Sequence, residues 1–319
     1  MARRAEKTFD VLVIGAGVIG QGWAIRFALF GWQVSIYDAD PEALTKCQAA
    51  MERVREHVST LYPQLPVAGE IRQVDSFQGT YDWVQESLPE VLEMKQACYA
   101  QLGSVDASVV ASSTSGFKPS DLMAQSSLAD RFVVCHPFNP VYLLPLVEVV
   151  PHAATSDPAL QMTDQTLQEI GMRPLHVKKE IDAHIADRLL EAVWREALWL
   201  VKDGVATTAD IDDAIKYGFG LRWAQMGMFE TYRLGGGEAG MAHFMAQFGP
   251  ALSWPWSRLT DVPELDEALV DKIVRQSDEQ SADYSVHELA AHRDRNLVAI
   301  MQALQNNNWG VGEHLNRYK

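Results

Sequence analysis

Over roughly the first 180 residues, short apolar runs alternate with stretches whose apolar positions repeat at helical spacing. A β-rich run at Phe9–Ile14 ends in glycines, a helical pattern follows over residues 18–30, and a second run covers Gln33–Asp38. Gly31 stands where the first helix should stop, and Pro41 stands where the next should open. This alternation predicts a mostly parallel sheet with helices on both faces. Further strands are predicted at Tyr81–Val84, Ser108–Ser112, Arg131–His136 and Leu146–Val150.

The pattern changes after Ile181. Residues 184–202 carry apolar side chains at helical spacing, and Gly204 follows as a stop signal. We therefore predict an α/β domain over residues 1–182 and an all-helical domain over residues 183–319, with no strand in the second domain. Further helices are predicted there over residues 207–217, 223–233, 264–277 and 286–304.

Composition narrows the possible partners. Hydrophobic residues make up 47% of the 319 residues and charged residues 22%, so the apolar cores need no disulfide or metal. Lys and Arg total 27 and Asp and Glu total 42, a net charge of −15, which argues against nucleic acid or an anionic membrane as the partner. No apolar run reaches the ~18 residues of a membrane span. The expected partner is a small-molecule substrate.

The cysteines and the start of the chain bear on its compartment. Cys47, Cys98 and Cys135 are odd in number and match no metal-ligand spacing. We therefore expect buried thiols in a reducing compartment and no metal site. Residues 1–4 superficially resemble the basic start of a signal peptide, but Arg26 and the glycines interrupt the apolar stretch behind them. We expect a cytoplasmic protein.

Gly15, Gly17 and Gly20 form a G-x-G-x-x-G pattern between an expected strand and an expected helix. In dinucleotide-binding proteins the first glycine permits a tight turn, and the second lets the backbone approach a pyrophosphate. The third lets the helix pack closely on the strand. Backbone N–H groups at the helix start, around Val18 and Ile19, would face the phosphates. We therefore predict a doubly wound, Rossmann-type sheet that binds a dinucleotide.

Asp38 indicates which dinucleotide is bound. It ends the second expected strand, about 20 residues beyond the glycines, where an acid binds the ribose 2′-hydroxyl. A carboxylate there repels a 2′-phosphate, so NAD is expected rather than NADP. FAD stays open as an alternative because it uses the same glycine pattern. An ordinary glycine turn with a surface Asp is the other alternative.

Three polar residues, Ser115, His136 and Asn139, lie at or just beyond the ends of later predicted strands, and a fourth, Glu148, lies on one. The carboxyl ends of strands in a doubly wound sheet face the ligand crevice. Oxidising an alcohol needs a base for the hydroxyl proton, which a histidine supplies near neutral pH. A carboxylate on the far ring nitrogen would fix the tautomer, so we predict His136 as base and Glu148 as its partner. The alternative is a structural histidine and an edge-strand glutamate.

The order of these motifs resembles the 3-hydroxyacyl-CoA dehydrogenase family over nearly the whole chain. The resemblance rests on the glycine pattern, the HPFNP and LVEV boxes that contain His136 and Glu148, and the helical second half. It implies that these two residues form a catalytic pair, that Ser115 positions the substrate, and that Asn139 acts beside the histidine. It also implies a homodimer built on the helical domains.

Two segments depart from the acyl-CoA enzymes. In the box at residues 183–190 (AHIADRLL), Asp187 stands where the resemblance implies a substrate-contacting Asn. An ionised Asp only accepts hydrogen bonds, so it suits a hydroxyl or a nearby cation; the alternative is a solvated residue on a helix. Residues 85–91 (QESLPEV), where we expect Glu86 to contact the cofactor, resemble the non-CoA branch that includes lambda-crystallin and gulonate dehydrogenase. A CoA thioester substrate is therefore not expected.

The second half further resembles non-CoA members whose substrate is a zwitterionic β-hydroxy acid with a trimethylammonium group. The matching segments are residues 220–227, 236–241 and 244–250. Six of the nine tryptophans lie beyond residue 182, and aromatic faces hold quaternary ammonium groups, which cannot donate hydrogen bonds. Core packing is the alternative for these rings. The expected substrate-binding side chains, besides Asp187, are Trp223, Phe229, Tyr232, Phe248 and Trp254.

The expected function is thus NAD-dependent oxidation of such a zwitterionic hydroxy acid. An enzyme that acts on another hydroxy acid, such as gulonate, is the first alternative. A catalytically silent, crystallin-like structural protein is an alternative of another class, which the intact His136, Glu148 and glycine pattern oppose.

Overall fold

The computed structural model divides between Asp187 and Arg188. One unit contains Met1–Asp187 together with Arg317–Lys319, and the other contains Arg188–Asn316. The border between residues 182 and 183 stays a prediction. The structure describes residues 9–103, 105–124, 126–224, 227–235, 240–248, 257, 264, 266–269, 271–272 and 286–319.

The first unit is built on an eight-stranded sheet in the order β3-β2-β1-β4-β5-β6-β7-β8. Neighbouring strands are parallel except β6 and β7, which are antiparallel, so the prediction of a mostly parallel sheet is confirmed. Only residues 138–145 join β6 to β7, and a parallel pair needs a crossover of about a dozen residues or more. The strands are β1 (Asp10–Ile14), β2 (Gln33–Tyr37), β3 (Ile71–Gln73), β4 (Thr80–Glu86), β5 (Asp106–Ser112), β6 (Phe132–Pro137), β7 (Leu146–Pro151) and β8 (Arg173–His176).

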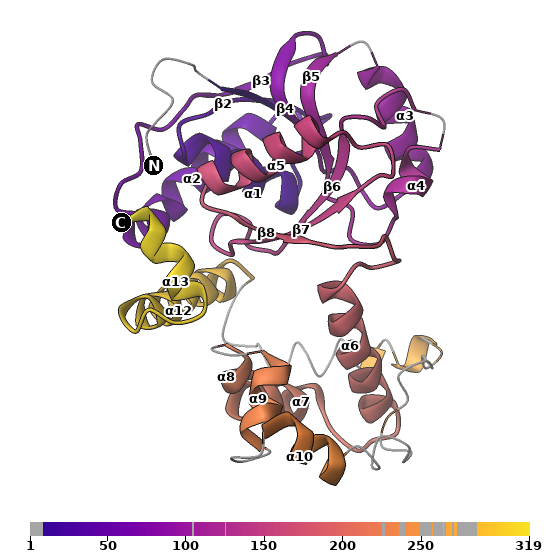
Figure 1. The fold of residues 1–319 in the computed structure, drawn as a ribbon, viewed down its shortest axis with the longest axis vertical. Helices are drawn as coiled ribbons and strands as arrows, with labels where there is room; N and C mark the ends of the chain where they lie inside the picture. Colours follow the sequence, from indigo (N-terminus) through magenta and orange to yellow (C-terminus); the bar gives the residue numbers. More distant parts are fainter. Residues whose placement is uncertain are drawn as a thin grey trace. The chain divides into compact units, whose positions relative to one another are not determined.

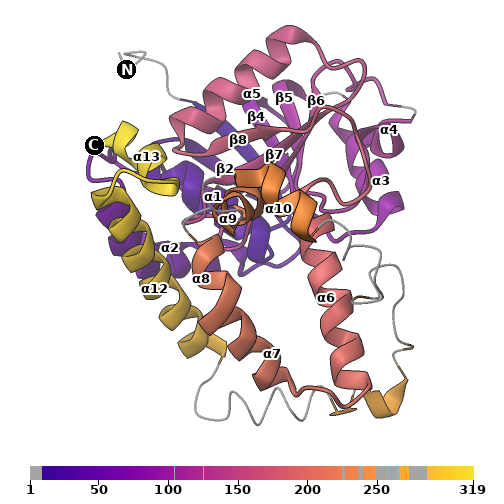
Figure 2. The same cartoon turned by 60° about the horizontal axis from the view of Figure 1, so that its bottom comes forward.

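Helices pack against both faces of this sheet. On one face Phe27 of α1 contacts Trp83 of β4, with ring centroids 6.1 Å apart. The next residue of β4, Val84, points the other way into a core that contains Tyr99 of α3. In Figures 1 and 2, α1 and α2 lie together, and α3 and α4 lie together elsewhere against the sheet. The helices are α1 (Val18–Leu29), α2 (Ala43–Leu61), α3 (Leu92–Leu102), α4 (Pro119–Leu122) and α5 (Asp157–Glu169).

Three details of this unit differ from the prediction. Strands β3 and β8 were not predicted, because three and four residues are too few to show a periodic pattern. Helix α2 begins at Ala43 rather than at Pro41, with Glu42 as its N-cap. These differences leave the order of the central strands as expected.

Arg26 of α1 is fully buried and joins four parts of the first unit. Its Nε donates to Ile170 O at 2.7 Å, and its Nη1 donates to Tyr142 O at 3.0 Å. Its Nη2 donates to Gly171 O at 2.7 Å and to the Tyr62 hydroxyl at 2.8 Å. The helix that opens at the glycine loop is therefore tied to the β6–β7 connection.

The described part of the second unit is helical, as predicted. The predicted helix over 223–233 begins only at Met228, and the one over 264–277 lies largely outside the described residues. Helix α13 packs closely on α12, because a Cβ on Gly312 would lie 2.0 Å from Leu304 O. The helices are α6 (Ala186–Lys202), which starts in the first unit, α7 (Thr208–Ala214), the π-helical turn η1 (Ile215–Phe219), α8 (Gly220–Trp223), α9 (Met228–Gly235), α10 (Gly240–Phe248), α12 (Val286–Asn306), α13 (Val311–Leu315) and the 3₁₀ turn η4 (Asn316–Tyr318).

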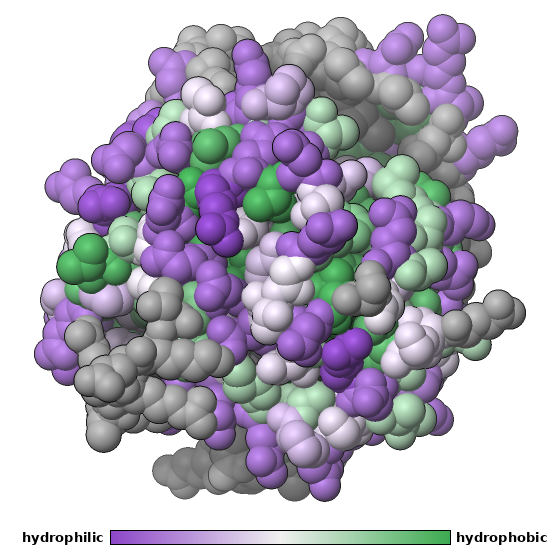
Figure 3. Space-filling view, turned by 90° about the horizontal axis from the view of Figure 1, so that it is seen from above, coloured by the Kyte–Doolittle hydropathy of each residue, from purple (hydrophilic) through white to green (hydrophobic). Residues whose placement is uncertain are grey.

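The surface carries mostly polar side chains on the face drawn in Figure 3, with smaller hydrophobic patches between them. Among the described residues, every helix is too short or too polar to span a membrane.

Candidate active site

The loop between β1 and α1 has the geometry that dinucleotide binding requires. Gly15 has a φ of 86°, and a Cβ there would lie 2.7 Å from Ser87 O. A Cβ on Gly20 would lie 1.8 Å from Gly15 O, so α1 can approach the loop only because Gly20 lacks a side chain. Gly17 faces open space, with no atom within 4 Å of the position of a Cβ. This opening at a helix start fits a pyrophosphate.

Val18 and Ile19 form the start of α1, after an N-cap glycine that offers no side-chain hydrogen bond. Asp38 follows β2, and its carboxylate accepts hydrogen bonds from Ala16 N at 2.6 Å and from Asp40 N at 2.8 Å. The acid is thereby held beside the glycine loop, where a ribose would lie. The cofactor contacts of these residues stay predictions.

The Glu86 side chain forms hydrogen bonds within the first unit. It is fully buried at the end of β4. One oxygen accepts from Leu88 N at 2.7 Å and from Lys95 Nζ at 2.9 Å. The other accepts from the hydroxyls of Tyr99 at 2.5 Å and Ser112 at 2.7 Å. These four donors engage both oxygens of the carboxylate, and the cofactor contact of Glu86 stays a prediction.

Lys95 and Glu90 hold the loop that contains Ser115. Lys95, which is buried, lies 3.3 Å from Glu90 Oε2. Glu90 Oε1 accepts hydrogen bonds from the Thr114 hydroxyl, from Ser115 N at 3.1 Å and from Gly116 N at 3.0 Å. Although burial acts to raise the pKa of Glu90, the Thr114 hydrogen bond and the Lys95 charge hold it below its ordinary value. Sequence analysis missed both residues; an acid and a lysine around the start of α3 are the signal that could have found them.

His136 and Glu148 stand directly opposite each other on β6 and β7. Opposed residues of antiparallel strands share one face, which brings His136 Nδ1 to 3.0 Å from Glu148 Oε2. The two side chains are 7% and 0% exposed. Glu148 Oε1 accepts from the backbone N–H groups of Ile185 and Ala186, each at 2.9 Å. Although burial acts to raise the pKa of Glu148, its hydrogen bonds with His136 and the two N–H groups hold it below its ordinary value.

Asp187 lies on the other side of the histidine ring. Its Oδ2 is 3.7 Å from His136 Nε2, which is beyond hydrogen-bond distance. The Asp187 side chain is 23% exposed. Burial raises the pKa of Asp187, although the nearby His136 acts to lower it. The structure thus brings the predicted Asp187 to the predicted pair.

A second histidine, His184, packs beside the pair and was not predicted. Its ring centroid is 5.7 Å from that of His136, and its Nε2 is 3.3 Å from Thr114 O. Ala183 and His184 both have left-handed backbone, with φ of 59° and 50°. Burial, reinforced by the nearby His136, lowers the pKa of His184, so its ring is neutral near pH 7. A neutral ring donates from Nε2 to the Thr114 carbonyl.

Ser115 and Asn139 lie in the loops after β5 and β6, which are neighbouring strands. The Ser115 loop reaches the segment before α6, because Ala183 N donates to Gly116 O at 3.1 Å. Asn139 is exposed and precedes a cis peptide bond to Pro140. Their positions are compatible with the predicted roles, which stay predictions.

The aromatic side chains predicted to bind substrate lie in the second unit. Trp223 packs against Phe219 with ring centroids 4.6 Å apart. Tyr232 stacks on Phe244 at 4.7 Å, and Phe248 contacts the same ring at 4.8 Å, so these rings also serve packing between α9 and α10. Their substrate contacts stay predictions. Phe229 is exposed, and Trp254 lies outside the described residues.

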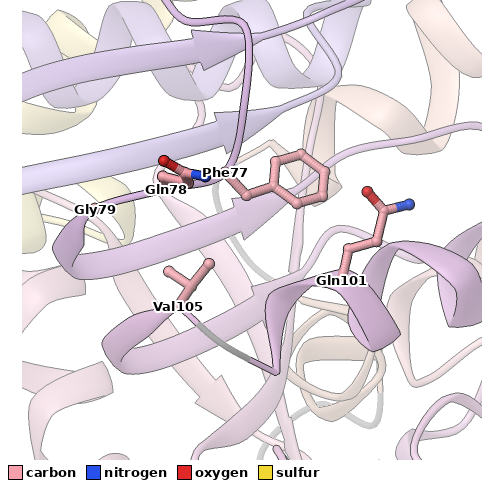
Figure 4. A pocket seen from close by; sticks show the side chains of 5 residues that line it. All are labelled: Phe77, Gln78, Gly79, Gln101 and Val105. Carbon is pink, nitrogen blue, oxygen red and sulfur yellow. The ribbon is translucent and has the colours of Figure 1, made fainter.

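A cavity of about 280 Å³ lies away from these residues, between the β3–β4 loop and the end of α3. Figure 4 shows Phe77 and Gln101 lining it, and it includes none of the predicted site residues. Within the ranges that the structure describes, no group of three or more His, Cys, Asp or Glu side chains is placed to hold a metal ion.

Curated relatives resemble this chain along most of its length. It is 52% identical over 312 residues to "L-carnitine dehydrogenase/betainyl-CoA thioesterase" of Ruegeria pomeroyi, covering 96% of this chain. The chain spans only 64% of that relative. It is also 47% identical to L-carnitine dehydrogenase of Pseudomonas aeruginosa, with 94% of each chain covered.

Solved structures share the fold. A 5-formyl-3-hydroxy-2-methylpyridine 4-carboxylic acid 5-dehydrogenase, described as an NAD⁺-dependent dismutase, superposes with a TM-score of 0.77 at 25% identity, covering 94% of this chain and 99% of the other. Mycobacterium tuberculosis FadB2 superposes with a TM-score of 0.61 at 21% identity, covering 86% and 95%.

Two family models account for most of the chain. Residues 10–181 match the NAD-binding domain of 3-hydroxyacyl-CoA dehydrogenase, so NAD is the cofactor of the first unit, consistent with its glycine loop. Residues 184–275 match the C-terminal domain of the same enzymes. The chain therefore belongs to the 3-hydroxyacyl-CoA dehydrogenase family.

Proposed function

We propose that this protein is an NAD-dependent dehydrogenase that oxidises the 3-hydroxyl of L-carnitine to 3-dehydrocarnitine. The observation that carries the proposal is the buried His136–Glu148 pair, which leaves His136 Nε2 facing away from Glu148. The relatives named L-carnitine dehydrogenase, at 45% to 52% identity, support this substrate.

His136 is the proposed base. Glu148, held ionised by two backbone donors, accepts the Nδ1–H of His136 and so leaves a lone pair on Nε2. The substrate hydroxyl donates to Nε2 and transfers its proton there as the alcohol becomes a ketone. The imidazolium that forms is stabilised by Glu148. Bound NAD supplies the acceptor for the hydride that leaves the same carbon.

Three further features belong to the proposal. Ser115 and Asn139 position the reacting oxygen or the pair, and aromatic side chains of the second unit hold the trimethylammonium group. The chain forms a homodimer through its helical unit, which exposes large apolar side chains such as Leu189 and Trp194. It works in the cytoplasm, which its unpaired cysteines favour.

The proposal is tested by following NADH absorbance with L-carnitine, D-carnitine, L-gulonate and 3-hydroxybutyrate in parallel. We expect selective turnover of L-carnitine. Turnover of gulonate alone would be compatible with the proposed catalytic pair but would refute L-carnitine as the substrate. Tight NADH binding without turnover of any alcohol would favour a crystallin-like structural role.

The base assignment has its own test. His136→Ala should lower kcat by about 10³-fold, within the range for loss of a general base. His176→Ala is the matched control, because His176 forms a similar pair with Asp164 at 2.9 Å on the surface. Wild-type turnover in His136→Ala would show that another group takes the proton.

A further inference from the structure

Asp187 is a carboxylate without a cationic partner at the proposed reaction centre. It lies 3.7 Å from His136 Nε2. Among the described residues, no Lys or Arg forms an ion pair with it. The nearby lysines are engaged elsewhere: Lys95 pairs with Glu86 and Glu90, and Lys118 pairs with Asp121 and Asp182.

The charged groups around Asp187 do not balance it. Glu148 and Glu90 add negative charge, and the nearest titratable ring besides His136, that of His184, is neutral near pH 7. The proton that His136 carries on Nδ1 is already matched by Glu148. The half-buried Asp187 therefore leaves one unit of negative charge uncompensated beside Nε2, a position that a cation would stabilise.

Capping at the start of α6 does not account for Asp187. The N–H groups of Ile185 and Ala186 at this helix start are capped by Glu148, not by Asp187. The side chain lies toward His136, and its gap of 3.7 Å leaves the Nε2 lone pair to accept a substrate hydroxyl.

We propose that Asp187 is the counterion of the substrate's quaternary ammonium group and so selects a cationic β-hydroxy acid. This rests on the proposed function. In carnitine, two carbon atoms separate the hydroxyl oxygen from the ammonium nitrogen, so a hydroxyl on Nε2 brings the cation within a few ångströms of the ring. A quaternary ammonium group has no N–H, and a carboxylate attracts it by charge alone, with no need for a directed hydrogen bond.

The test compares L-carnitine with its neutral-headed analogue 3-hydroxy-5,5-dimethylhexanoate, in which a carbon atom replaces the nitrogen. The isosteric change Asp187→Asn should lower kcat/KM for carnitine about 100-fold more than it lowers kcat/KM for the analogue, because only carnitine carries the cation. Asp187→Glu, which keeps the charge, should retain the preference for carnitine. Equal losses on both substrates, or an unchanged preference in Asp187→Asn, would overturn the proposal.

A binding measurement separates this proposal from the proposed function. γ-Butyrobetaine lacks the hydroxyl and so needs no base; its affinity for the enzyme–NADH complex is measured by calorimetry. We expect Asp187→Asn, but not Asp187→Glu, to weaken it by about 100-fold. If γ-butyrobetaine binding depends on Asp187 but the enzyme does not turn over carnitine, the proposed oxidation is refuted and the role of Asp187 as counterion is supported. Binding that is equally strong in Asp187→Asn would refute the counterion, as would a wild-type complex that binds no γ-butyrobetaine.

Discussion

Replacing Glu148 by Gln tests the link between geometry and chemistry at the proposed site. The glutamine side chain has the same size as glutamate, but its oxygen and its NH₂ group differ, so its two orientations are no longer equivalent. Ile185 N and Ala186 N, each at 2.9 Å, require an acceptor, so the amide oxygen faces α6 and the NH₂ group faces His136. The opposite orientation would set buried donors against each other at a cost of about 1–3 kcal/mol.

This orientation places the imidazole in the wrong tautomer. The amide donates to Nδ1, so His136 carries its proton on Nε2 and cannot accept another from the substrate. General-base catalysis contributes about 10²–10⁴ in rate. We therefore expect kcat with L-carnitine to fall by about 10³-fold, or ~4 kcal/mol of barrier, while NADH affinity stays unchanged.

The assay is steady-state NADH formation, with NADH binding followed by fluorescence. Asp164→Asn is the matched control, because it breaks the surface pair with His176 and should leave kcat unaltered. A kcat for Glu148→Gln within tenfold of wild type would refute the tautomer argument.

The same variant should change the acid stability of the protein. The pKa of Glu148 lies below its ordinary value of 4.5, so the ionised carboxylate stabilises the fold. That contribution is present above the unfolded-state value and is lost as the pH falls through the lower folded value. Urea unfolding at pH 7 and at acid pH should therefore show a smaller acid loss of stability for Glu148→Gln. An equal loss would contradict the assigned pKa direction.

Three further predictions concern the first unit. Arg26→Met removes the guanidinium donor from the carbonyls of Ile170, Tyr142 and Gly171, although Gly171 O keeps the Tyr62 hydroxyl as a donor. Urea unfolding should therefore show a loss of about 3 kcal/mol, and a loss below ~1 kcal/mol would contradict the hydrogen-bond network. Gly17→Ala adds a Cβ that contacts no protein atom but occupies the expected pyrophosphate position. Its Tm should therefore be unchanged, while the Kd for NADH should rise at least ~10-fold. An unchanged Kd would show that the pyrophosphate does not bind at Gly17. Burial raises the pKa of Cys47 and Cys98 to about 12. Iodoacetamide labelling of these thiols, followed by mass spectrometry, should therefore be far slower in the native protein than in the unfolded one. Equal labelling rates would contradict their burial.

The local sequence pattern predicted much of the structure of the first unit. The alternation of runs and helices predicted the central strands, and the glycines with Asp38 predicted an NAD site, because each signal depends on residues close together in the chain. Short strands such as β3 escaped prediction because their pairing, rather than their composition, makes them strands.

Glu86 shows what the local sequence pattern could not reveal. In the folded unit Lys95, Tyr99 and Ser112 donate hydrogen bonds to its carboxylate. Nothing in the neighbouring sequence reveals donors that come from α3 and β5. A buried carboxylate must find partners, and only packing decides which ones.

For the catalytic pair, the sequence by itself determined that a histidine and a glutamate follow in boxes twelve residues apart. Only the tertiary structure decided that antiparallel β6 and β7 place the two residues opposite each other and that Ile185 and Ala186, at the start of α6, donate their N–H groups to Glu148. It also decided that Asp187 lies on the far side of the histidine ring. The physical reason is that hydrogen bonds and charge pairs act over a few ångströms in space, whatever the distance along the chain.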